Sequence, residues 1–400
     1  MNIILFDEPT IRQSLVPLTY TRPVAEIRIG ILTIAEKWQH YAGAATSYLT
    51  QPYLQQKYPK QPGTPAVYIN GAVCPDEQLV AQVKQLKQGE GLYHNGMLVA
   101  LHSGGQQLQS VEELLQFVVT EKQEVENCVV VRQVWEIFQF NGAQIRSDFK
   151  LITAGRKSQP LQDRHTMVYG EENIFIEEGV VVRAAVLNAE AGPIYLGKNA
   201  QVEEGALIRG PFALCEGSTV NMGGKMRGDT TVGPQSKVGG EIGNSVILGY
   251  SNKGHDGYLG NSVLGEWCNL GADTNTSNLK NNYAPVKLWS YARNGFVNTG
   301  QQFCGLIMGD HSKSGINTMF NTGTVVGVAA NVFGAGFPRN MIPSFAWGGA
   351  AGFETFQLNK AYEVAERVMA RRKIDLTDTD KAILAEVFEQ SKQYRVWENV

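Results

Sequence analysis

The 400-residue sequence lacks an excess of charge of either sign and lacks any long apolar run. Charged residues make up 18% of it, and the formal net charge at pH 7 is −3. This balance provides no electrostatic footprint for nucleic acid, so we expect no nucleic-acid partner. No apolar stretch approaches the length that crosses a bilayer. The first ten residues carry Asp7 and Glu8 without a basic flank, unlike a secretory signal, and we expect no membrane partner.

Cysteine is also scarce. The five cysteines are odd in number and scattered, and none of them shows metal-ligand spacing. We therefore expect no metal site and a reducing, cytoplasmic location. These cysteines are Cys74, Cys128, Cys215, Cys268 and Cys304.

A bulky aliphatic residue returns at every sixth position between residues 196 and 238. Neither a helix nor an ordinary strand has that period, whereas a β-sandwich would alternate with period two. A six-residue repeat indicates a solenoid in which each short strand forms one side of a triangular coil. The repeat predicts a left-handed parallel β-helix, and it resumes at 264–276 and 308–332. The first run comprises Leu196, Val202, Ile208, Leu214, Val220, Met226, Val232 and Val238.

The chain is too long for one ordinary core, and its patterns predict three domains. Residues 1–170 indicate a Rossmann-like α/β domain, and residues 171–337 form the β-helix. Residues 338–400 form a helical extension, because their apolar residues recur at three and four. Within it, Thr377 followed by Asp380 marks the start of a second helix.

The repeat is interrupted in two places. In the segment K-G-H-D-G-Y-L-G, residues 253–260, the register slips, so a histidine at 255 would project from the coil rather than fill it. Between residues 278 and 303 a polar and aromatic stretch loses the register and would leave the coil as a loop. Loops of that length usually carry function or disorder.

The stretch from Lys253 through Asn278 resembles the acetyltransferase half of bifunctional GlmU-type enzymes, which make UDP-N-acetylglucosamine. The family pattern reads G-H-x-x-Y-L-G, then N-x-G-A-G-T and a later Asn. Residues 309–318, G-D-H-S-K-S-G-I-N-T, also resemble archaeal members. The residues that fall on matched positions without a gap are His255, Tyr258, Asn269 and Asn278.

The resemblance implies an acetyl-CoA-dependent N-acetyltransferase acting on a hexosamine 1-phosphate, above all glucosamine 1-phosphate. His255 would be the general base for the amine that attacks the thioester, since imidazole accepts protons near neutral pH. Tyr258 and Asn269 would hold sugar hydroxyls or phosphate, and Asn278 would lie beside the amine and the thioester. Family members are trimers with acetyl-CoA sites between neighbours, so the resemblance also implies a homotrimer.

The phosphate-binding residues are less well defined by the resemblance. Lys280 or Lys287 could meet the sugar phosphate, and Arg227 is a further candidate. Where family members carry a phosphate-binding lysine twelve residues before the catalytic histidine, this chain has Gly243. The sequence therefore supports acyl transfer more firmly than it identifies the sugar.

The first domain resembles sugar-phosphate nucleotidyltransferases but lacks their chemical positions. The resemblance lies in P-L-T-Y-T-R-P at 17–23 and in V-W-E-I-F at 134–138. The family's glycine-rich loop is replaced by residues 7–16, which contain no glycine. Val24 stands where a lysine is expected, and Ala72 stands where a magnesium-binding aspartate is expected. These changes argue against ordinary metal-assisted nucleotidyl transfer.

Three functions remain open from the sequence. The first is N-acetyl transfer, and the second is sugar-1-phosphate nucleotidyl transfer, alone or as a partner activity. In that second case Mg²⁺ and UTP would bind the first domain. The third is a non-catalytic scaffold that binds a nucleotide sugar. An altered nucleotide site in the first domain would use Arg12, Arg22, Lys37 and Asn70.

Overall fold

The computed structural model describes residues 2–63 and 65–399, and the chain packs as two compact units. The predicted domain boundaries at residues 170 and 337 stay a prediction. The first unit comprises Met1–Ile27 and Leu32–Gln133, and the second comprises Arg28–Ile31 and Val134–Val400.

The first unit is built on a mixed six-stranded sheet in the order β2-β1-β3-β6-β5-β7. β1 pairs in parallel with β2 and β3, whereas β6 is antiparallel to β3 and β5. This arrangement confirms the predicted α/β domain. The strands are β1 (Asn2–Phe6), β2 (Thr46–Leu49), β3 (Ala66–Asn70), β5 (Glu90–His94), β6 (Met97–His102) and β7 (Glu121–Glu124), beside a small pair of β4 (Val73–Cys74) and β8 (Val129–Val130). The helices are α1 (Pro9–Ser14), α2 (Ile34–Ala42), α3 (Glu77–Gln85) and α4 (Val111–Leu115).

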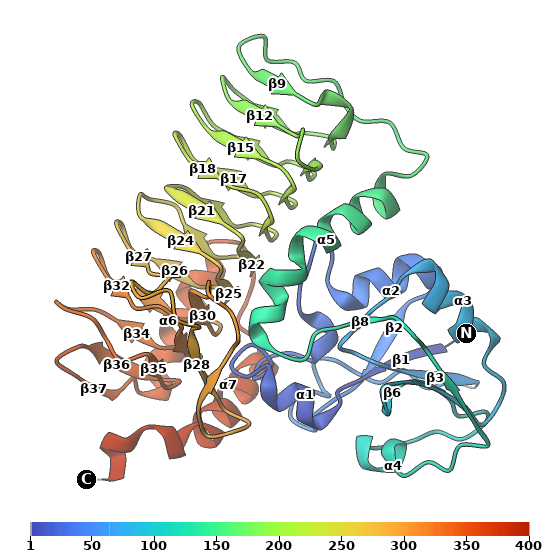
Figure 1. Ribbon diagram of the computed structural model, residues 1–400. Helices are drawn as coiled ribbons and strands as arrows, with labels where there is room; N and C mark the ends of the chain where they lie inside the picture. The colour runs from blue at the N-terminus through green and yellow to red at the C-terminus, as the bar shows by residue number, and fades with distance from the viewer. Residues whose placement is uncertain (1, 64, 400) are drawn as a thin grey trace. The chain divides into compact units, whose positions relative to one another are not determined.

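The second unit is a parallel β-solenoid with three faces, whose strands stack as successive rungs in Figure 1. Partner residues on neighbouring rungs are commonly 18 residues apart, as in the pair Leu196 and Leu214. The aliphatic residues of the predicted repeat are buried in one continuous core. These findings confirm the predicted parallel β-helix.

We number the three sheets of the coil 1, 2 and 3. Sheet 1 contains β10 (Ile174–Ile176), β13 (Ile194–Leu196), β16 (Phe212–Leu214), β19 (Thr230–Val232), β22 (Val246–Gly249), β25 (Val263–Glu266), β30 (Leu306–Met308), β33 (Thr324–Val326) and β35 (Met341–Ile342). Sheet 2 contains β11 (Val181–Val182), β14 (Gln201–Val202), β17 (Thr219–Val220), β20 (Lys237–Val238), β23 (Asn252–Lys253), β26 (Asn269–Leu270), β31 (Lys313–Ser314), β34 (Asn331–Val332), β36 (Ala346–Gly349) and β37 (Gly352–Thr355). Sheet 3 contains β9 (Met167–Tyr169), β12 (Val186–Asn188), β15 (Leu207–Arg209), β18 (Lys225–Met226), β21 (Glu241–Gly243) and β24 (Tyr258–Gly260), followed along the same face by the pair β27 (Asn275–Thr276) and β32 (Met319–Phe320).

Helix α5 (Val134–Thr153) packs on the outer surface of sheet 1, against β16, β19, β22 and β25. The Asn141 amide donates a hydrogen bond to the carbonyl oxygen of Asp229 at 2.9 Å. The contact at Gly142 is close: a Cβ there would lie 1.9 Å from a carboxylate oxygen of Asp229, so that side chain would have to move. Of the three faces of the coil, sheet 1 is therefore the one that this helix covers.

The stretch from residue 278 to residue 303, predicted as a loop, is a β-hairpin that leaves the coil. β28 (Lys287–Ser290) pairs antiparallel with β29 (Gly295–Asn298). The polar composition of this stretch did not predict the two strands. The side chains of Val286 and Leu288 are buried and anchor the hairpin. We call residues 278–303 the insertion hairpin. After it the coil resumes in register, with Met308 beside Leu264.

Two helices close the chain, as predicted. α6 (Leu358–Ala370) follows the β36–β37 hairpin, and α7 (Asp378–Gln390) begins at the capping box formed by Thr377 and Asp380. Among the described residues, no helix combines the length and the apolar character needed to cross a membrane.

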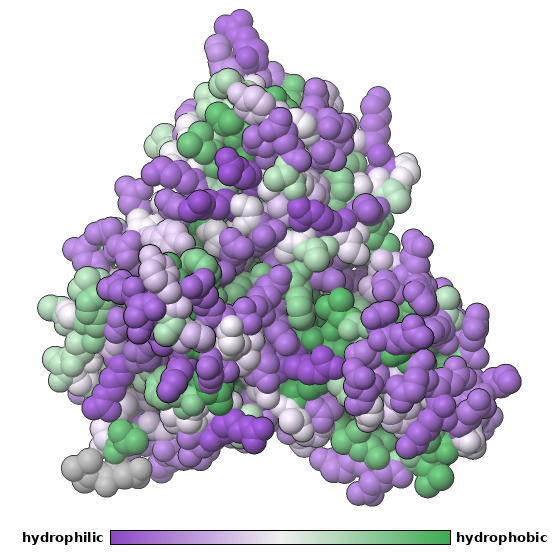
Figure 2. All heavy atoms as spheres, viewed as in Figure 1, coloured by the Kyte–Doolittle hydropathy of each residue, from purple (hydrophilic) through white to green (hydrophobic). Residues whose placement is uncertain are grey.

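On the face seen in Figure 2, hydrophilic residues predominate at the protruding edges of the coils, with hydrophobic patches between them.

Candidate active site

Lys253 occupies an interior position of the coil that valine holds on the preceding turns. In sheet 2, Val220 pairs with Val238, and Val238 pairs with Lys253. The Lys253 side chain is fully buried. Its Nζ donates hydrogen bonds to the carbonyl oxygens of His255, at 2.6 Å, and Asp256, at 2.7 Å. Because a buried ammonium must replace its hydration, this lysine binds the corner that follows β23.

His255 lies on that corner, where the chain passes from sheet 2 to sheet 3. Its side chain is exposed, while its backbone carbonyl receives the Lys253 hydrogen bond. Gly257 adopts a φ of +110° on the same corner, and a Cβ there would lie 2.3 Å from the carbonyl oxygen of Thr274. The corner is therefore closely packed, and it presents the imidazole to the outside of the coil.

Tyr258 and Asn278 come together on the outer face of sheet 3. Asn278 Nδ2 donates to the Tyr258 hydroxyl at 3.0 Å and to Asn261 Oδ1 at 2.8 Å. Burial raises the pKa of the Tyr258 phenol above its usual value, so the group stays protonated at neutral pH. Since its oxygen accepts from Asn278, its proton is available for an acceptor on a ligand. Tyr258 and Asn278 were predicted from the sequence, whereas Asn261 was not, although its place directly after Y-L-G is a usable signal.

We expect Gly260→Ala to disrupt this pair. A Cβ at residue 260 would lie 2.3 Å from the Tyr258 hydroxyl and 2.6 Å from Asn278 Nδ2, so both side chains must move. If they hold the acceptor, acetyl transfer should fall roughly tenfold or more, since small misplacements at a reacting site are costly. Gly249→Ala is the matched control, because its nearest contact would be 3.4 Å. Equal activity in the two variants would contradict a role for the pair.

Arg227 lies across Gly243, the residue that stands in place of the expected lysine. A Cβ at Gly243 would lie 3.1 Å from Cβ of Arg227 and 3.5 Å from its Cδ. The guanidinium pairs with Glu241 at 3.1 Å, and the Arg227 side chain is 66% exposed. An exposed ion pair contributes only about 0–1 kcal/mol. Arg227 can therefore exchange Glu241 for a phosphate at little cost.

Two further cations that the sequence analysis missed lie on the same face. Arg209 and Lys225 line, with Arg227 and Glu241, a shallow pocket of about 410 Å³. The register pairs Leu207 with Lys225, which places Arg209 beside Arg227 on the neighbouring turn. A spacing of one coil turn between basic residues is the sequence signal that identifies this group.

The remaining matched residue, Asn269, lies on a different face. It is exposed on β26 of sheet 2, where it pairs with Asn252 on one side and Lys313 on the other. Tyr258 belongs to sheet 3. Within one chain, the structure therefore does not join Asn269 to the pair formed by Tyr258 and Asn278, and the His255 corner lies between the two sheets.

Lys280 and Lys287 belong to the insertion hairpin. Lys280 Nζ donates to the carbonyl oxygen of Pro285 at 3.0 Å, and Lys287 is exposed at the start of β28. Both line a groove of about 1240 Å³ that they share with residues near the C-terminus. Neither lysine lines the shallow pocket beside Arg227.

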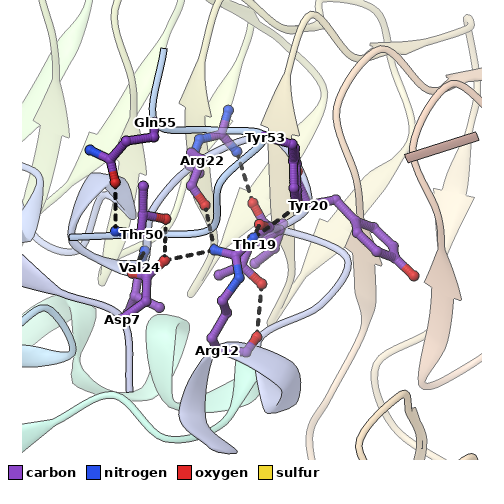
Figure 3. A network of polar contacts seen from close by, with 10 residues as sticks. Asp7, Arg12, Thr19, Tyr20, Arg22, Val24, Thr50, Tyr53 and Gln55 are labelled. Carbon is purple, nitrogen blue, oxygen red and sulfur yellow. Dashed lines mark hydrogen bonds and ion pairs between the residues drawn. The ribbon is translucent and has the colours of Figure 1, made fainter. Parts of the chain in front are cut away.

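In the first unit, the segment that replaces the glycine-rich loop is closed by its own side chains (Figure 3). Arg12 forms a buried ion pair with Asp7 at 2.8 Å. The same carboxylate accepts from the Thr50 hydroxyl at 2.6 Å and from the Val24 amide at 2.8 Å. Arg12 also donates to the carbonyl oxygen of Thr19. Asp7 and Arg12 therefore serve the packing of this segment.

The other candidates for a second site are also buried. Arg22 donates to the carbonyl oxygen of Leu18 at 3.2 Å, and Lys37 is 1% exposed on α2. Asn70 bonds to the Leu98 carbonyl and the Ala72 amide. These positions do not fit a magnesium-bound nucleotide, because Ala72 offers no carboxylate and the Asp7 carboxylate is engaged. Nucleotide binding by Arg12, Arg22, Lys37 and Asn70 stays a prediction that this packing does not support.

Comparison with known proteins finds likenesses to a sugar nucleotidyl transferase family and to bifunctional GlmU proteins. Residues 3–157 match a family model described as sugar nucleotidyl transferase. A bifunctional protein GlmU from Methanocaldococcus jannaschii is 32% identical over 169 residues, which cover 38% of this chain and 35% of the relative. Over part of its length the chain is therefore similar to GlmU-type proteins.

Two more relatives extend this similarity. A bifunctional sugar-1-phosphate nucleotidylyltransferase/acetyltransferase from Sulfurisphaera tokodaii is 28% identical over 144 residues, or 36% of this chain and 35% of the relative. An uncharacterized acetyltransferase YaiX from Escherichia coli O6:K15:H31 is 26% identical over 171 residues, or 42% of this chain and 71% of the relative. The chain thus aligns with about a third of each archaeal relative, and the names of these proteins support transferase activity in it.

Proposed function

We propose that this protein is a cytoplasmic N-acetyltransferase that transfers the acetyl group of acetyl-CoA to a hexosamine 1-phosphate. Glucosamine 1-phosphate is the proposed acceptor, in the biosynthesis of UDP-N-acetylglucosamine or a related nucleotide sugar. The observation that carries the proposal is the ordered corner that presents His255 beside the polar outer face of sheet 3. An exposed imidazole next to hydrogen-bonding and cationic groups is the arrangement that acyl transfer to an amino sugar phosphate requires.

The proposed reaction uses His255 as general base and then as general acid. The imidazole takes a proton from the acceptor amine while the nitrogen of that amine forms a bond to the carbonyl carbon of the thioester. The tetrahedral intermediate collapses when the carbon–sulfur bond breaks, and the imidazolium returns the proton to the departing thiolate. The products are the N-acetylated sugar phosphate and free coenzyme A.

In this proposal, the outer face of sheet 3 orients the acceptor. The Tyr258 hydroxyl, held by Asn278 at 3.0 Å, donates to a sugar oxygen. The sugar phosphate replaces Glu241 beside Arg227, with Arg209 and Lys225 contributing further positive charge. Bidentate binding of phosphate by arginine fixes orientation as well as affinity.

A homotrimer accounts for the separation of Asn269 from the other proposed residues. Helix α5 covers the middle strands of sheet 1, so we propose that copies pack through sheets 2 and 3 and the His255 corner. In a trimer, sheet 2 of one copy would approach the His255 corner of another and bring its Asn269 row toward the acceptor. We therefore propose that each site is completed between neighbouring copies.

The test is a paired assay of both half-reactions on the purified chain. Acetyl-CoA and glucosamine 1-phosphate should release free thiol, and UTP with N-acetylglucosamine 1-phosphate and Mg²⁺ should release no pyrophosphate. Thiol release that does not depend on the amino sugar would contradict the proposed acceptor.

A second candidate, nucleotidyl transfer, is favoured by the family match over residues 3–157. The closed network around Asp7 opposes it. Pyrophosphate release would establish it, whereas silence in both assays would favour a scaffold that binds a nucleotide sugar without catalysis.

A further inference from the structure

The groove that contains Lys280 and Lys287 is larger than a sugar phosphate requires. It lies within the second unit, between the insertion hairpin, the β36–β37 hairpin and the last residues of the chain, and its volume is about 1240 Å³. Pockets for drug-sized ligands commonly enclose roughly 300–1,000 Å³. In Figure 1 the strand β28 descends from the coil toward α7, which brings the insertion hairpin to the C-terminal segment.

The charge of the groove has one sign. Lys280, Lys287 and Arg339 line it, and no aspartate or glutamate stands among its described lining residues. Lys287 and Arg339 are exposed, and neither forms an ion pair or a side-chain hydrogen bond within the part of the chain that the structure describes. Unneutralised cations in the groove favour a ligand with more than one negative charge.

Aromatic rings from both sides of the groove provide surfaces for a planar group. Trp289 and Phe296 of the insertion hairpin meet edge to face at 5.4 Å, and Trp289 also meets Tyr394 of the C-terminal segment at 6.4 Å. On the opposite wall Phe353 stacks on Trp397 at 5.9 Å. Phe296 is 50% exposed. A flat heterocycle can therefore stack in the groove while its charged groups reach the cations.

The turn of the β36–β37 hairpin forms a further wall of small residues. Gly349, Ala350, Ala351 and Gly352 line the groove, and Gly352 has a φ of +135°, which favours glycine. Without bulky side chains, the backbone amides of this turn can be approached closely by an oxygen of a ligand. The groove thus combines surfaces for a ring with surfaces for phosphate.

We propose that this groove binds a nucleotide, a planar base carrying two or more phosphate groups. Two sources share this chemistry: the adenosine 3′-phosphate 5′-diphosphate portion of coenzyme A and a nucleoside diphosphate sugar. The first source rests on the proposed acetyl transfer, whereas the nucleotide chemistry of the groove does not.

The experiment measures nucleotide binding to the full chain by isothermal titration calorimetry. The probes are coenzyme A, adenosine 3′,5′-bisphosphate and UDP-N-acetylglucosamine. In the double variant Lys287→Gln/Arg339→Gln, the affinity for the binding probe should fall roughly 10- to 100-fold, since hydrogen bonds to charged groups are among the stronger ones. Lys198→Gln is the matched control, because Lys198 is exposed on an early turn outside the groove, and it should bind as the unmodified chain does.

Each outcome is decisive for the groove. Binding of coenzyme A and the bisphosphate identifies the coenzyme as the ligand, and binding of the UDP sugar alone identifies the nucleotide sugar; either result supports the proposal when the double variant weakens it. Absence of binding by all three probes, or unchanged affinity in the double variant, overturns it. His255→Asn should bind the same probe normally. If the unmodified chain binds nucleotide but transfers no acetyl group, the proposed function is contradicted, whereas the proposal of nucleotide binding in the groove is still supported.

Discussion

His255→Asn is expected to lower the rate of acetyl transfer to the amino sugar by roughly 10²- to 10⁴-fold while leaving the fold intact. Asparagine keeps a polar side chain of similar reach on the exposed corner, and the backbone carbonyl of residue 255 can still accept from Lys253. It cannot take the proton of the attacking amine. General base catalysis contributes roughly 10²- to 10⁴-fold, so kcat for thiol release should fall by that factor.

The control for this variant is another exposed histidine of the solenoid. His165 lies at the start of the coil, and its ring meets the guanidinium of Arg164. His165→Asn should leave kcat unchanged. Restoration of His255→Ala activity by added imidazole would strengthen the assignment. Activity of His255→Asn above a tenth of the original would instead mean that another group accepts the proton.

The repeat made the coil predictable because each short strand turns one side chain inward. Where the coil is regular, counting by six finds the interior residues, and Val202, Val220 and Val238 are all buried. After Val238 the turns shorten: Val238 pairs with Lys253, only 15 residues later. The corner geometry, rather than the composition, sets this change, so no count along the chain predicts that a lysine lies inside the coil.

The residues of the site were partly predictable for a similar reason. A motif identifies residue types and spacing, and this was sufficient to select Tyr258, Asn269 and Asn278 as candidates. A motif does not say on which face of the coil each residue lies. Only the pairing of neighbouring strands shows that Asn269 lies on a different sheet from Tyr258, and that Arg209 lies beside Arg227. The network of Asp7 depends on Thr50, which is distant in sequence, and no local pattern predicts such a contact.

Lys253→Met is expected to lower kcat while leaving the affinity for acetyl-CoA nearly unchanged. Methionine fills most of the buried space, but it cannot donate to the carbonyl oxygens of His255 and Asp256. The corner then loses the two bonds that fix the position of His255. Since a displacement of about 1 Å can cost roughly 10²-fold in rate, we expect kcat to fall about 10- to 100-fold. Lys253 acts here as a positioning residue, through the backbone of the corner.

The control must separate positioning from a general loss of stability. Val202→Ala removes packing from the same interior column, three turns before Lys253 along the register, and buried truncations of this kind typically cost 1 kcal/mol or more. It should lower the unfolding midpoint without changing kcat. In Lys253→Ala, a small alkylammonium ion should restore part of the lost rate, because it supplies the missing donors. Equal loss of kcat in Val202→Ala would contradict positioning.

Stability against pH tests the charge of Lys253 without any assay of activity. Burial lowers the pKa of Lys253 from 10.5 to about 8, with Asp256 and Asp273 acting in the opposite direction. Between these two values the unfolded chain binds more protons than the folded chain, so stability rises with pH across this window and the cost of the buried charge is greatest below pH 8. Lys313, whose pKa burial also lowers to about 8, contributes equally to both proteins. The urea midpoint of the unmodified chain should therefore rise relative to that of Lys253→Met between pH 7.5 and pH 10. A constant difference would mean that burial does not lower the pKa of Lys253 and that its ammonium stays charged inside the coil across this range.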